Sequence, residues 1–131
     1  MGITRLAAWV CFGFVAVLSL LPSAEMVRTS FGGHVEHAMA YAVLAALMRL
    51  GYPAWGAGRL VLALVAYAGL LECMQNFSPG RGPAVADWLA SSAGVLIGVG
   101  VACWAAGWIS AVGHRMGRRS VIYRDRRTSD G

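Results

Sequence analysis

The run from Trp88 to Val112 contains no charged residue, and this run limits the possible folds of the chain more than any other feature. An apolar stretch of more than about 18 residues is long enough to cross the hydrocarbon core of a bilayer as a helix. Only 13% of the residues are charged, against roughly 25% in ordinary soluble domains. We therefore expect an all-α integral membrane protein, with the lipid bilayer as its first partner.

Three further apolar runs complete a predicted four-helix transmembrane bundle within residues 1–112. We expect helices at about 6–22, 34–51, 59–77 and 87–111. The first run also resembles a signal peptide, but Pro22 stands where cleavage requires a small residue, so we interpret the run as a retained helix. The second run is the weakest span, because polar residues lie at both of its ends.

The positions of the arginines predict that both termini are cytoplasmic. With that orientation Arg5, Arg49, Arg59 and the arginines of the basic 113–131 tail lie inside, and only Arg28 and Arg81 lie outside. We expect the tail to be solvated and disordered beside an anionic leaflet. The formal charge of +5 does not indicate nucleic-acid binding, because no nucleic-acid motif accompanies it.

This topology brings the start of the second helix, the end of the third and the start of the fourth to the outer face. Polar side chains are concentrated in these three segments. The candidate cluster contains His34, Glu36, His37, Tyr41, Glu72, Gln75, Arg81, Asp87 and Ser91. Acidic residues near a bilayer are costly and are usually paired or functional. Arg81 is the expected ion-pair partner of Glu72 or Asp87.

Three interpretations of this cluster stay open. It could be a structural ion pair, or a site where Arg81 binds a polar envelope molecule such as an envelope lipid or a wall precursor. It could also be catalytic, with Glu72 or Asp87 as base and His37 as acid or base. His34 and His37 lack the spacing of known zinc motifs, so we expect no metal and no cofactor.

Small residues recur every four positions along the fourth helix. They are Ala90, Gly94, Gly98 and Ala102. Such a stripe lets another helix approach closely. It therefore predicts helix packing, either within the chain or against a partner membrane protein or a second copy, as in a structural or assembly subunit.

The order of these residues resembles the VanZ-like membrane proteins over roughly residues 10–105. The matching features are Ser19-Leu-Leu-Pro22, His37-x-x-x-Tyr41, Glu72-x-x-Gln75, Phe77, Pro79, Arg81, Asp87, Gly94 and Gly98. The chain departs from the family in two places. Gly33-His34 replaces the usual Asp-Lys, although His34 could supply a pH-dependent positive group, and Ser91 replaces a frequent Asn.

The resemblance implies a four-helix, multi-pass protein of the bacterial inner (cytoplasmic) membrane. The family namesake is linked to low-level resistance to teicoplanin, a glycopeptide that acts on the cell wall. No reaction is established for the family, so the resemblance implies a location near the cell envelope and leaves the question of catalysis open.

Overall fold

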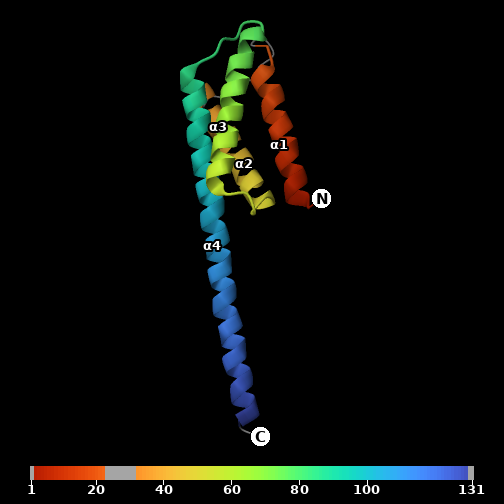
Figure 1. Ribbon diagram of the computed structural model, residues 1–131, viewed down its shortest axis with the longest axis vertical. Helices are drawn as coiled ribbons and strands as arrows, with labels where there is room; N and C mark the ends of the chain where they lie inside the picture. The colour runs from red at the N-terminus through yellow and green to blue at the C-terminus, as the bar shows by residue number, and fades with distance from the viewer. Residues whose placement is uncertain (1, 23–31, 130–131) are drawn as a thin grey trace.

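The computed structural model describes residues 2–22 and 32–129, with side chains up to Gly113. Within these residues the chain forms helices and no strand: α1 (Ile3–Leu20), α2 (Gly33–Gly51), α3 (Ala57–Met74), the short 3-10 helix η2 (Gln75–Phe77) and α4 (Val85–Ser129). The four α-helices run alternately up and down, so both chain termini lie toward the same end of the bundle (Figure 1). The predicted all-α, four-helix architecture is confirmed.

The bundle has an upper and a lower end as drawn in Figure 1. The upper end holds the end of α3, the loop 78–84 and the start of α4, and the lower end holds the start of α1 and the turn 52–56. Which end faces the cytoplasm stays a prediction from the arginine positions. Arg28, which entered that prediction, lies outside the described residues.

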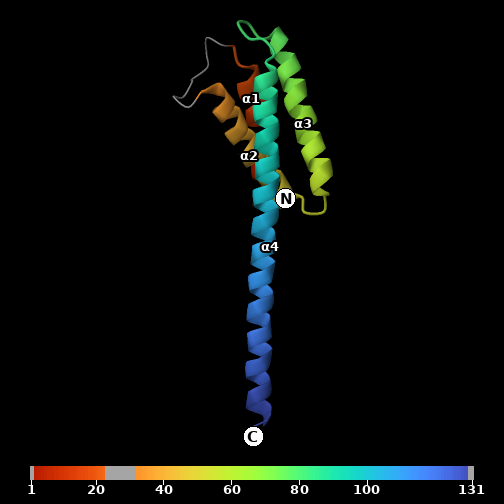
Figure 2. The same ribbon diagram turned by 90° about the vertical axis from the view of Figure 1, so that its left-hand side faces the viewer.

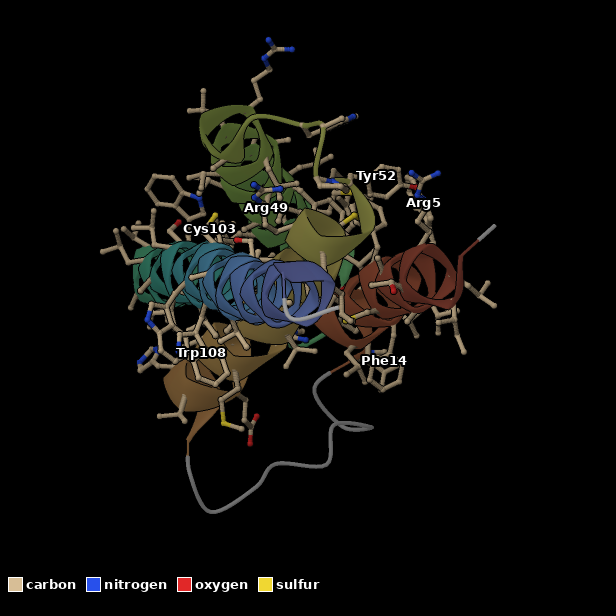
Figure 3. The ribbon with its side chains drawn as sticks, turned by 90° about the horizontal axis from the view of Figure 1, so that it is seen from below. Arg5, Phe14, Arg49, Tyr52, Cys103 and Trp108 are labelled. Atoms are coloured by element: carbon tan, nitrogen blue, oxygen red, sulfur yellow. The ribbon has the colours of Figure 1, made fainter. Side chains whose placement is uncertain are left out.

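Within the described residues, three helices are long and apolar enough to cross a membrane: α1, Ala57–Phe77, and Val85–Gly113 of α4. Large apolar side chains on these helices are exposed, including Leu62 (72%) and Trp104 (71%). Phe14 and Trp108 are exposed as well, at 60% and 63%, and Phe14 lies on the outer side of α1 (Figure 3). A surface this apolar fits a bilayer rather than water.

The second helix is different, since it is not apolar enough to be one of these three spans. It nevertheless packs against each of the other three helices, most extensively against α4. It buries Tyr41, Leu44, Ala45 and Met48, which recur at helical spacing. Its 19 residues would span about 28 Å, close to the thickness of a hydrocarbon core.

Two glycines of α4 allow the close approach of α2. A Cβ added to Gly94 would overlap the carbonyl oxygen of Ala38 and lie 2.9 Å from its carbonyl carbon, and Gly98 has the same relation to Ala42. Ala102 continues this face, with 3% of its surface exposed, and Ala90 is partly buried. The small-residue stripe thus contacts a helix of the same chain, and α2 rather than a partner covers its two glycines.

Hydrogen bonds to mid-helix carbonyls connect the remaining helices. Tyr67 of α3 stacks on Phe12 of α1 with ring centroids 4.0 Å apart, and its hydroxyl donates to the Phe12 carbonyl at 2.8 Å. The indole N–H of Trp88, in the first turns of α4, donates to the Val65 carbonyl of α3 at 3.2 Å. These contacts hold α3 to its two neighbours and fix the direction in which α4 starts.

Helix α4 is much longer than the predicted 87–111 segment. It continues to Ser129, so residues 113–129 are helical where a disordered tail was expected. Arginine and methionine are good helix formers, and no proline occurs after Pro83 to interrupt the helix. The 45 residues correspond to about 68 Å, more than twice the core of a bilayer, and the lower part of α4 extends well beyond the other helices (Figure 2).

Candidate functional site

A histidine and an aspartate join the start of α2 to the start of α4 at the upper end. His34 Nδ1 lies 2.6 Å from Asp87 Oδ1, and the side chain of His34 is 68% exposed while that of Asp87 is 21% exposed. Each residue lies in the first turn of its helix. The carboxylate is favourably placed there, because the N-terminus of a helix carries partial positive charge.

His37 continues this contact toward the interior. Its Nε2 lies 3.8 Å from Asp87 Oδ2, and its Nδ1 lies 3.5 Å from the hydroxyl oxygen of Ser91. Ser91 is 2% exposed, and the His37 side chain is 15% exposed. One tautomer suits both neighbours: Nδ1 accepts from the serine hydroxyl, and the Nε2 proton faces the carboxylate. We call His34, Asp87, His37 and Ser91 the histidine–aspartate chain, which runs from an exposed to a buried residue.

Glu72 and Gln75 lie at the end of α3 and make a different arrangement. Glu72 is 6% exposed, and its Oε1 accepts the backbone N–H of Ala84 at 2.7 Å. It therefore ties the end of α3 to the loop that leads into α4. Gln75 is 2% exposed, and its Nε2 has no hydrogen-bond partner within the described part of the chain.

Arg81 does not form the predicted ion pair with Glu72 or Asp87. Its Nη1 donates to the carbonyl oxygens of Ser19 at 3.0 Å, Leu18 at 3.2 Å and Leu21 at 3.4 Å. These carbonyls end α1, where no later turn supplies donors. A guanidinium there also faces the negative end of the helix dipole. Arg81 binds the helix end rather than a carboxylate because that end offers several acceptors at once, whereas Glu72 already accepts a backbone N–H.

The remaining candidates occupy α2. Tyr41 lies one turn after His37 and is 2% exposed, with its ring centroid 6.3 Å from that of Tyr67. It is thus part of the core between α2 and α3. Glu36 lies in the first turn of α2 and is partly buried.

The structure thus brings four of the predicted residues, His34, Asp87, His37 and Ser91, into one chain of contacts. Glu72 and Arg81 make two separate capping interactions, and Tyr41 belongs to the core. Sequence reasoning missed the backbone partners, namely the Ala84 N–H and the carbonyls at the end of α1. It also missed Ser78, whose hydroxyl donates to the Leu20 carbonyl at 2.8 Å. Pro22 signals where α1 ends and hence where carbonyls lack donors, but nothing in the sequence marks the Ala84 N–H or says which side chain reaches those carbonyls.

These features define a class: a small helical membrane protein with a histidine–aspartate chain where two of its helices begin. The family model described as VanZ/LLP1 matches residues 2–106, and the chain belongs to this family. The match includes the whole histidine–aspartate chain and both capping interactions. No curated protein and no solved structure matches the chain.

Proposed function

We propose that the histidine–aspartate chain binds a polar group of an envelope lipid or wall precursor at the outer face of the bacterial inner membrane. The observation that supports this proposal is the continuous set of contacts from exposed His34 through Asp87 to His37. Ionisable residues in a membrane bundle are rare and often mark a binding site. Imidazole N–H groups suit a phosphate oxygen, and the carboxylate suits a hydroxyl.

The residues proposed to contact the ligand differ from the sequence prediction, which gave that role to Arg81. Arg81 Nη1 is bound to the end of α1 and Glu72 Oε1 to the Ala84 N–H, so both side chains already make contacts within the protein. The side chains of His34 and Asp87 are more exposed than that of Glu72 and can therefore reach a ligand more easily. The proposed site is therefore the start of α2 and α4 rather than the loop 78–84.

A polyprenyl phosphate is a suitable probe, because it combines a membrane-soluble tail with the headgroup chemistry of wall precursors. We expect the purified chain in detergent to bind it, and His34→Ala or His37→Ala to weaken binding about tenfold, because each substitution removes an imidazole N–H that would donate to the phosphate. Isothermal titration measures the change. Ser92→Ala is the matched control, because the Ser92 hydroxyl donates to Trp88 of its own helix at 2.8 Å. Equal affinity in wild type and both site variants would contradict the proposal.

Orientation is a separate prediction, since a site for a wall precursor must face outward. A reporter that is active only outside the cytoplasm should be active when it is fused at residue 28 or 81. The same reporter should be inactive when it is fused at residue 55 or 120. The reason is the excess of arginine at the lower end and in the tail. The reverse pattern would place the histidine–aspartate chain on the cytoplasmic side and exclude the proposed ligand class.

The link to teicoplanin resistance stays a prediction. It is tested by measuring the teicoplanin susceptibility of bacteria with and without this protein.

An enzyme is the second candidate, supported by the position of His37 between Asp87 and Ser91. A carboxylate that orients an imidazole is a common arrangement for general acid–base catalysis. Glu72 is less suited to the role of base, because its carboxylate is buried and bound to a backbone N–H. For an enzyme, Asp87→Asn should abolish turnover of the bound molecule while leaving its binding intact.

A further inference from the structure

A cavity of about 270 Å³ lies between α1, α2 and α3, toward the lower end and away from the histidine–aspartate chain. Its lining residues come from all three helices and from the turn 52–56. They are Trp9, Phe12, Met48, Tyr52, Trp55, Leu60, Ala63, Leu64 and Tyr67. Its volume is near the lower limit of small-molecule sites.

Three polar atoms of the lining side chains, on Trp9, Tyr52 and Tyr67, already take part in hydrogen bonds within the protein. The Trp9 indole N–H donates to the Tyr52 hydroxyl at 2.7 Å, and the Tyr67 hydroxyl donates to the Phe12 carbonyl at 2.8 Å. A water molecule needs two or more polar partners, and an apolar cavity without them stays dry. The cavity therefore suits a hydrocarbon rather than a polar ligand.

The mouth of the cavity lies next to a cation. Trp9 and Trp55 are 50% and 53% exposed, which marks the open side. Arg5 is exposed, and its guanidinium carbon lies 5.0 Å from the ring centroid of Tyr52, while its Nε donates to the Gly51 carbonyl at 2.9 Å. Figure 3 shows Arg5 and Tyr52 side by side at the lower end. The cation is thus held beside a wall of the cavity, where an anionic headgroup would be attracted.

We propose that this cavity binds one acyl chain of an anionic phospholipid, whose phosphate contacts Arg5. In a protein with helices that can span a membrane, acyl chains are the hydrocarbon at hand, and the arginine supplies the complementary charge. The proposal does not depend on the function proposed for the upper end. It concerns other residues and the leaflet at the opposite end of the bundle.

Native mass spectrometry of the purified full chain with long-chain phosphatidylglycerol tests the proposal. We expect one retained lipid, and Ala63→Phe should reduce the retained fraction about tenfold because the ring fills the cavity. Ala66→Phe is the matched control, because Ala66 is an exposed alanine of the same helix and does not line the cavity. Arg5→Gln should reduce the preference for phosphatidylglycerol over phosphatidylcholine about fivefold. Equal retention of the lipid by Ala63→Phe and Ala66→Phe would overturn the proposal.

A second measurement uses the wild-type chain, so it does not depend on whether a variant folds. Phosphatidylglycerol with a photoreactive group on its acyl chain should label Ala63 and Tyr67 more strongly than Leu62, which is 72% exposed on the same helix. Uniform labelling of all three residues would show ordinary surrounding lipid and would overturn the proposal.

Discussion

Replacing Gly94 by leucine will push α2 away from α4 and lower the melting temperature of the protein. Even one added carbon at Gly94 would overlap the Ala38 carbonyl, which belongs to the backbone and cannot rotate away. Overpacking a core costs about 1–3 kcal/mol, and leucine adds more atoms than alanine. For a chain of this length we expect a fall in Tm on the order of 10 °C, measured by thermal unfolding in detergent.

Gly100→Leu is the control for this change. Gly100 lies on the same helix, but a Cβ there would meet nothing within 4 Å. The two variants therefore share composition and helix propensity, and they differ in the face of α4 that carries the side chain. If both variants lower the Tm equally, the loss comes from glycine replacement in general and not from the contact between α2 and α4.

Much of the fold could be predicted from the sequence, because the apolar runs are long and their ends carry arginine or proline. The first three helices begin and end within about three residues of the predicted limits. Helix α2 is the informative case, since its composition alone is too polar for a span. Its position follows from packing, because Gly94 and Gly98 form a surface that only a close helix can cover.

The end of α4 could not be predicted in the same way. A strongly basic tail is typical of a solvated segment, yet arginine also has good helix propensity, and a helix already formed by α4 needs no new nucleus to continue. Composition alone does not decide between these two effects.

The candidate site was predicted in part. The histidine–aspartate chain follows from side chains that share helix faces, such as Asp87 and Ser91 four residues apart. The partners of Glu72 and Arg81 did not follow, because both are backbone groups. Every residue has such groups, so no residue type identifies them as partners. Only the geometry of a loop against a helix end decides which carbonyl a guanidinium reaches.

Arg81→Ala will destabilise the upper end of the bundle by about 2 kcal/mol, the range for hydrogen bonds to charged groups. The substitution removes the donor for the Ser19, Leu18 and Leu21 carbonyls and leaves the Ser78 hydroxyl, bound to Leu20, to cap the end of α1 near the membrane surface. We expect a fall in Tm of about 5–10 °C. Ser78→Ala, which removes the hydroxyl that donates to Leu20, should have a smaller effect, about 1 kcal/mol, because that bond is neutral.

Arg59→Ala is the control, since Arg59 is an exposed arginine near the start of α3 at the other end of the bundle. Equal Tm values for the Arg81 and Arg59 variants would contradict the capping role. Binding of polyprenyl phosphate then separates the two roles considered for Arg81. If Arg81→Ala keeps its Tm but loses the ligand, the arginine binds the envelope molecule directly. If it loses stability while the folded fraction still binds, Arg81 shapes the upper end by holding α1, and the histidine–aspartate chain makes the ligand contacts.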